Sequence, residues 1–196
     1  MKKAAAILLA ISVLFLVGCS DSDGDMKKPK ETAVTVTTGD CFEINKLHGE
    51  DGNEKFSYTV KTHDGKVIES AVCANEPKVK PLNDDLLGVR FYTATDSFVR
   101  YYDLKAGRVS ASYFGAFWDN GTLVAYNDFE KNGKLIVRDI FDDNGYRYEK
   151  EIKSDSLTLI VTKATDDGET LIVKFKLGEH GAEKNVRLPL VDKSSD

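Results

Sequence analysis

The sequence has few of the residues and motifs that carry enzyme chemistry. Only three histidines are present, His48, His63 and His180, and none is spaced as H-x-x-x-H or lies beside a pair of cysteines. A zinc site needs three or four converging ligands, so we expect no metal site and interpret the three as solvated loop residues. The chain also lacks G-x-S-x-G, S-x-x-K and a glycine-rich phosphate loop. We therefore predict no catalytic residue and no cofactor.

Basic clusters are missing from the part of the chain with a globular composition. The densest basic stretch is Lys27-Lys28-Pro29-Lys30, which lies in a segment poor in apolar residues, and the whole chain has a net charge of −5. Proteins that bind nucleic acids usually show a basic patch or stripe. The sequence therefore predicts no nucleic-acid partner.

The chain has one long apolar run, residues 4–17, in which only Ser12 is polar, and it is too short for a transmembrane helix, which needs about 20 apolar residues. Because Met1-Lys2-Lys3 precedes it, the run is typical of a signal peptide. It ends in Leu16-Val17-Gly18-Cys19, which resembles the bacterial lipobox. The resemblance implies cleavage before Cys19 and a lipid on its sulfur. Loss of Lys2 and Lys3 changes the net charge from −5 to −7. The alternative is a buried N-terminal helix with a stray cysteine.

The lipobox resemblance also implies a location. Lipoproteins with aspartate directly after the cysteine tend to stay in the inner membrane, and this chain has Ser20 there. We expect a cell-envelope protein, anchored to the membrane through its lipid and, in a Gram-negative host, on the outer membrane facing the periplasm. Residues 19–32 are polar and cannot bury enough surface to fold, so we interpret them as a flexible tether. Residues 33–192 are predicted to form a single β-rich domain.

A period of two in the apolar residues dominates this domain. Phe56, Tyr58 and Val60 alternate with polar residues, and the same pattern recurs through 171–177 and 186–190. Such alternation is typical of half-buried antiparallel strands. Six glycine turns separate the predicted strands: Asp64-Gly65, Ala106-Gly107, Asn120-Gly121, Asn132-Gly133, Asn144-Gly145 and Asp167-Gly168. We predict an all-β antiparallel meander of about a dozen strands. Residues 77–85 are expected to be irregular, with a helical turn at 82–87.

Three segments, 86–114, 121–152 and 156–190, share one plan of strand, turn, strand, turn, strand, with a spacing near 35 residues. Within them, residues 117–121 (FWDNG), 123–126 (LVAY) and 134–139 (KLIVRD) resemble one blade of a TolB-type β-propeller. The resemblance implies a propeller-like fold. A barrel and a sandwich built from the same meanders remain as alternatives.

Cys41 and Cys73 are an even pair once Cys19 carries the lipid. In an oxidising compartment such a pair usually forms a disulfide, so we predict a bond between them. The alternative is two free buried thiols.

Aromatic residues are concentrated between Phe91 and Tyr126. The adjacent pairs Tyr101-Tyr102 and Phe117-Trp118 cannot both face the core of a strand that is buried on one side only. One residue of each pair should face outward, where aromatic side chains favour binding. We therefore predict Tyr102 and Trp118 as binding residues. The alternative is a sheet packed on both faces.

Together these observations favour a non-enzymatic binding or scaffold module of the cell envelope, with an envelope protein or a glycan as its partner. The alternative is an envelope hydrolase or glycan-active enzyme that uses loop carboxylates, since glycosidases need two carboxylates across a cleft. Most carboxylates occur in the predicted turns, where aspartate supports the backbone. The candidates are Asp51, Asp64, Asp84, Asp85, Asp142, Asp143, Asp166 and Asp167.

Overall fold

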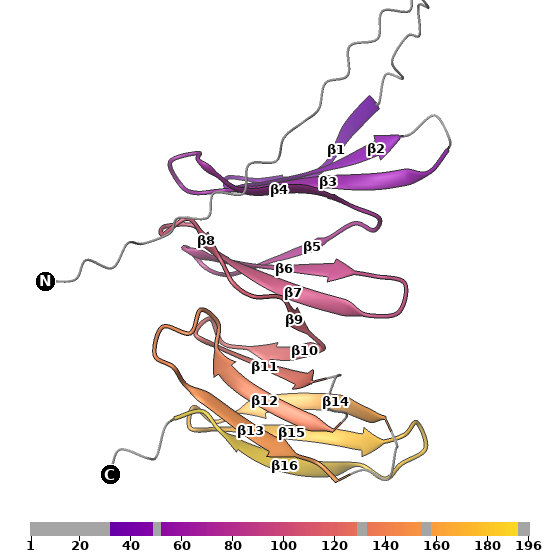
Figure 1. Cartoon of the computed structure of the whole chain (residues 1–196), viewed down its shortest axis with the longest axis vertical. Coiled ribbons are helices and arrows are strands. Elements are labelled where there is room, and N and C mark those ends of the chain that lie inside the picture. Colours follow the sequence, from indigo (N-terminus) through magenta and orange to yellow (C-terminus); the bar gives the residue numbers. More distant parts are fainter. Residues whose placement is uncertain (1–31, 49–51, 129–132, 154–157, 192–196) are drawn as a thin grey trace, which may run out of the picture. The chain divides into compact units, whose positions relative to one another are not determined.

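The computed structural model describes residues 32–48, 52–128, 133–153 and 158–191, and every regular element in them is a β-strand (Figure 1). The strands form four antiparallel sheets, here named A to D in chain order, and none is closed into a barrel. The predicted all-β class is confirmed. The predicted signal peptide, Cys19 and Asp51 lie outside the described residues. Within the described ranges, no helix has the length and apolarity that a membrane crossing requires.

Sixteen strands make up these sheets. Sheet A contains β1 (Thr32–Gly39), β2 (Phe42–His48), β3 (Glu54–Lys61) and β4 (Val67–Cys73). Sheet B contains β5 (Lys78–Asn83), β6 (Leu86–Tyr92), β7 (Ser97–Asp103), β8 (Arg108–Val109) and β9 (Tyr113–Phe114). Sheet C contains β10 (Ala116–Asp119), β11 (Leu123–Asp128), β12 (Lys134–Asp139) and β13 (Arg147–Glu151). Sheet D contains β14 (Leu159–Asp166), β15 (Thr170–Leu177) and β16 (Lys184–Pro189). The two-residue strands β8 and β9 are too short to show a period of two, which explains part of the lower predicted count.

The predicted hairpins are present. Segments 121–152 and 156–190 contain the three-stranded meanders β11–β12–β13 and β14–β15–β16, and 86–114 contains β6, β7 and the two short strands that pair with β7. The glycine of each of the six predicted turns has a positive φ angle. Only glycine adopts these angles without a steric penalty, and these turns therefore fix the ends of the strands beside them.

The prediction of an irregular segment at 77–85 is wrong. Residues 78–83 form β5, which pairs with β6 from Lys78↔Arg90 to Asn83↔Leu86. Pro81 made this segment look irregular, because proline has no N–H for a sheet ladder. β5 is the edge strand of sheet B, and an edge strand tolerates a proline. A tight turn at Asp84-Asp85 replaces the predicted helical turn.

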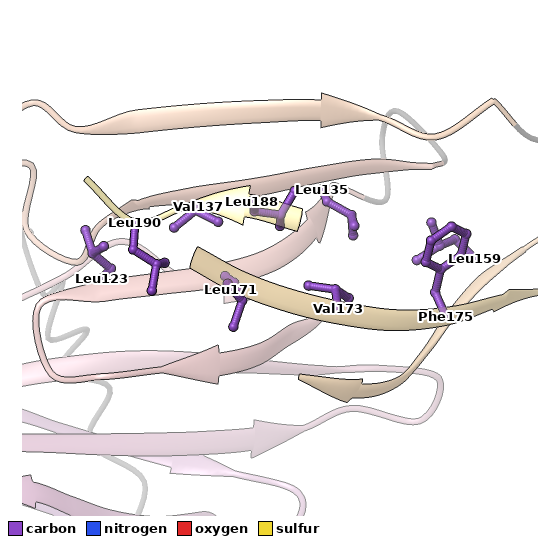
Figure 2. Close-up of a cluster of buried hydrophobic side chains, with 10 residues drawn as sticks. Leu123, Leu135, Val137, Leu159, Leu171, Val173, Phe175, Leu188 and Leu190 are labelled. Carbon is purple, nitrogen blue, oxygen red and sulfur yellow. The ribbon is translucent and has the colours of Figure 1, made fainter. Parts of the chain in front are cut away.

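Three hydrophobic clusters join the sheets in chain order. The first combines residues of sheets A and B, among them Ile44, Tyr58 and Val89. The second combines sheets B and C and includes Tyr101 and Val124. The third joins sheets C and D, with the side chains shown in Figure 2. Sheets B and C are consequently buried on both faces, which accounts for their continuous apolar runs.

Candidate functional site

A pocket of about 590 Å³ opens where the turns of sheets B and C meet. The β5–β6 and β7–β8 turns of sheet B form one wall, and the β10–β11 and β12–β13 turns of sheet C form the other. We call it the turn pocket. The charged residues that line it are Asp84, Asp85, Asp103, Lys105, Arg108, Asp139 and Asp143. Its volume falls in the range of small-molecule sites.

Arg108 holds the two walls of the turn pocket together. Its guanidinium donates two hydrogen bonds of 2.7 Å to the carboxylate of Asp143 in sheet C, and its Nε donates to Asp103 at 3.1 Å. The same guanidinium lies 4.4 Å from the centre of the Phe141 ring. A bidentate arginine–carboxylate pair fixes geometry as well as charge, so the walls are pre-arranged for a ligand.

These contacts keep two pocket carboxylates ionised. The hydrogen bonds from Arg108 lower the pKa of Asp143. Burial favours the protonated form of Asp103, but the backbone N–H of Ala106 and the guanidinium of Arg108 outweigh it and lower that pKa as well. Both groups are therefore hydrogen-bond acceptors at neutral pH.

Asp84 and Lys105 differ from the other charged residues of the turn pocket. Within the described part of the chain, neither side chain has a hydrogen-bond or ion-pair partner, and both residues are exposed. The backbone N–H of Lys105 donates to Asp103 at 3.2 Å. By contrast, Asp139 is buried, and its Oδ2 accepts the backbone N–H groups of Asn144 and Tyr146 at 2.9 Å each. Asp139 thus supports the β12–β13 turn, while Asp84 and Lys105 are available to a ligand.

The structure contradicts the outward orientation predicted for Tyr102. Its side chain is 0% exposed, as is that of Tyr101. The two side chains enter opposite interfaces, since Tyr102 packs between sheets A and B and Tyr101 between sheets B and C. The alternative of a sheet packed on both faces is correct here, so Tyr102 is a core residue and not a surface binding residue.

Trp118 is partly buried between sheets C and D. Its indole packs against the third cluster, and its Nε1 donates to Oδ2 of Asp166 at 3.1 Å. Phe117 packs against the same cluster, because the pairing of β10 with β11 shifts by one residue between Ala116 and Trp118. Such a bulge lets neighbouring side chains face the same way. Trp118 thus contacts both sheet C and sheet D, and it does not line the turn pocket.

The structure does not contain the predicted disulfide, because Cys41 and Cys73 are both free thiols. The register of sheet A explains this difference. The backbone carbonyl of Cys41 accepts the N–H of Lys61 at one end of β3, while Cys73 pairs with Phe56 five residues away. At about 3.4 Å per residue the separation is roughly 17 Å, and a disulfide needs Cα atoms less than about 7 Å apart.

Three of the predicted loop carboxylates, Asp84, Asp85 and Asp143, come together in the turn pocket. The other described candidates do not line it: Asp64 lies at the β3–β4 turn, Asp142 at the β12–β13 turn, and Asp166 and Asp167 at the β14–β15 turn. His48 and His180 are exposed, but His63 contacts both Cys41 and Asp85. In the described ranges, no group of three or more His, Cys, Asp or Glu residues is arranged to hold a metal ion.

Sequence patterns did not reveal Arg108 or Phe141. Arg108 and Asp143 are 35 positions apart, and only the packing of sheet B on sheet C brings them together. Comparison with family models, curated proteins and solved structures finds no match for the chain. The similarity to a propeller blade therefore rests on the sequence pattern of residues 117–139.

Proposed function

We propose that the chain is a lipid-anchored binding module of the bacterial cell envelope, and that the turn pocket binds a cell-wall glycan. The lipobox pattern at 16–19 supports the anchor, with diacylglycerol on Cys19 and residues 19–32 as the tether. In a host with an outer membrane, the β-rich domain would face the periplasm. Its proposed role is to hold a ligand and not to transform it.

The arrangement of the turn pocket carries this proposal. Ionised carboxylates only accept hydrogen bonds, so a ligand for Asp84 has to supply hydroxyl or ammonium donors. Lys105 adds a donor for a ligand carboxylate. Cell-wall glycans with peptide stems carry all three groups. Because the Arg108 contacts already order Asp103 and Asp143, binding has to order only the side chains of Asp84 and Lys105.

A hydrolase using the loop carboxylates is less well supported. A general acid in a glycosidase needs a raised pKa to stay protonated at neutral pH. The pKa values of Asp103 and Asp143 are lowered instead. These two groups suit ligand binding better than proton donation.

We expect the Asp84→Asn variant to bind purified cell-wall sacculi about tenfold more weakly than the wild type, since a charge-assisted hydrogen bond contributes roughly 1.5–3 kcal/mol. Co-sedimentation of the full-length chain with sacculi measures this affinity. Glu179→Gln is the matched control, because it removes the same charge from an exposed turn of sheet D. Equal binding by wild type and Asp84→Asn, or no binding by either, would refute the glycan proposal.

The anchor has its own test. We expect Cys19→Ala to abolish incorporation of a labelled fatty acid and to release the protein from the membrane fraction, because the lipid on this residue is the proposed anchor. Metabolic labelling followed by membrane fractionation checks both effects. Cys73→Ala is the control and should keep both the label and the membrane association. An unlabelled wild-type protein would exclude a lipoprotein.

A further inference from the structure

Cys41, His63 and Asp85 form a chain of contacts that crosses from sheet A to sheet B. The sulfur of Cys41 lies 3.5 Å from Nδ1 of His63, and Nε2 of the same ring lies 2.9 Å from Oδ1 of Asp85. The three residues come from the β1–β2, β3–β4 and β5–β6 turns. A thiol, a base and a carboxylate in this order match the arrangement that activates a nucleophile.

Backbone hydrogen bonds hold each of these three residues in place. The carbonyl of Cys41 accepts the N–H of Lys61 at 2.8 Å, and the N–H of His63 donates to the carbonyl of Leu104 at 3.3 Å. The N–H of Leu104 in turn donates to the carbonyl of Asp85 at 2.8 Å. The contact between the sheets therefore does not depend on the side chains alone.

Asp85 determines which nitrogen of His63 carries the proton. A carboxylate only accepts hydrogen bonds, so the proton of the neutral ring belongs on Nε2, and Nδ1 presents its lone pair to the sulfur. His63 can then take the thiol proton, and Asp85 stabilises the imidazolium that forms. The ring is half-exposed, so it exchanges protons with water.

Access to the sulfur limits the reagents that it can meet. Cys41 is 7% exposed, which favours the smallest reagents over a polypeptide or a glycan chain as its reaction partner. Cys73 provides a contrast within the same sheet. Its thiol faces the carbonyl oxygens of Phe56 and Asn75, and burial raises its pKa, so both effects favour the unreactive neutral form.

We propose that Cys41 is a base-activated thiol that small hydroperoxides oxidise to a sulfenic acid. The sulfur attacks one peroxide oxygen, so that an S–O bond forms as the O–O bond breaks. Sulfur loses two electrons and the peroxide gains them. The thiol proton, taken up by His63, goes to the leaving oxygen, and hydrogen peroxide thus yields water. Cys73 is roughly 17 Å away along β3, so it cannot resolve the sulfenic acid as an internal disulfide.

The test treats the full-length chain with hydrogen peroxide, removes the peroxide, and then unfolds the chain in urea that contains dimedone, which traps sulfenic acids. Peptide mass spectrometry follows the label on each cysteine. We expect Cys41 to be labelled at least about tenfold faster than Cys73. The His63→Gln variant should lose at least about tenfold in rate at Cys41, because a positioned base contributes 10²-fold or more. Asp85→Asn should lose about threefold, and the rate at Cys73 should stay unchanged in both variants.

His180→Gln is the matched control, since it replaces an exposed histidine on a turn of sheet D. A faster reaction of Cys73 in His63→Gln would reveal local unfolding. In that case, the rate at Cys41 in Asp85→Asn alone decides whether the contacts of His63 activate the thiol. Equal wild-type rates at the two cysteines, or an unchanged rate at Cys41 without His63, would overturn the proposal. Cys41 could also react with a p-nitrophenyl ester and form an acyl-enzyme, but not react with peroxide. That result would overturn the proposed oxidation and would assign acyl transfer to Cys41 instead. Sacculus binding is measured separately, so this outcome does not depend on the glycan proposal.

Discussion

Replacing Tyr102 with alanine is expected to lower the free energy of unfolding by about 3–5 kcal/mol, the range for removing a buried aromatic ring. The ring lies in the cluster between sheets A and B, and its hydroxyl donates to Oε2 of Glu69 at 2.6 Å. The other oxygen of Glu69 accepts Nη1 of Arg100 at 2.6 Å. The alanine variant leaves a cavity and removes one partner of this carboxylate. Urea denaturation, with the midpoint and slope compared, measures the loss.

Two further variants separate the contributions of Tyr102. Tyr102→Phe keeps the ring and removes the hydrogen bond to a charged acceptor, so we expect a loss of about 1.5–3 kcal/mol. Tyr92→Ala makes the same substitution at an exposed tyrosine and should cost less than about 1 kcal/mol. If Tyr102→Ala and Tyr92→Ala had similar effects, the packing of sheet A on sheet B would not be as described.

The second large effect is a loss of stability in alkaline solution. Burial raises the pKa of Tyr58 and of Tyr113 to about 12, and it also raises the pKa values of Tyr101 and Tyr102. In the unfolded chain these phenols ionise near pH 10. Their contribution to stability is therefore complete below about pH 10 and is lost as the pH rises towards 12. Each phenol accounts for about 1.4 kcal/mol per pH unit over this window.

Urea denaturation at intervals between about pH 9 and pH 12 measures this slope. Tyr113→Phe is the informative variant, because it removes one titrating phenol while the ring remains in the core. It should reduce the slope by about 1.4 kcal/mol per pH unit. A control at Tyr92, Tyr92→Phe, should leave the slope unchanged, because the Tyr92 ring is exposed. A wild-type stability that stays constant up to pH 12 would contradict the buried positions of the tyrosines.

Local sequence patterns predicted the strands, because alternation and tight turns depend only on residues that are neighbours in the sequence. Alternation at 171–177 and a glycine turn at Asp167-Gly168 are sufficient to place β15 after a hairpin, and the structure agrees. The segment around Pro81 shows where such patterns fail. A proline argues against a strand unless the strand lies at an edge, and the position of a strand in its sheet depends on pairing with distant residues.

The site residues illustrate the same limit. Tyr101 and Tyr102 are adjacent, so one of them would face outward in a strand buried on one side only. Only the packing of sheets A and C on either side of sheet B buries both. Cys41 and Cys73 suggested a disulfide by their number and proposed compartment. The register of β3 separates them and instead places Cys41 beside His63.

The sequence by itself determined the fold class, the hairpin turns and the meander plan, because a period of two and a positive φ angle are properties of a few adjacent residues. Only the tertiary structure decided which sheet faces are covered, how Arg108 joins the walls of the turn pocket, and how Cys41, His63 and Asp85 meet. These contacts join residues 22 to 35 positions apart. Their geometry depends on strand register and on the stacking of whole sheets, neither of which leaves a trace in the local order of residues.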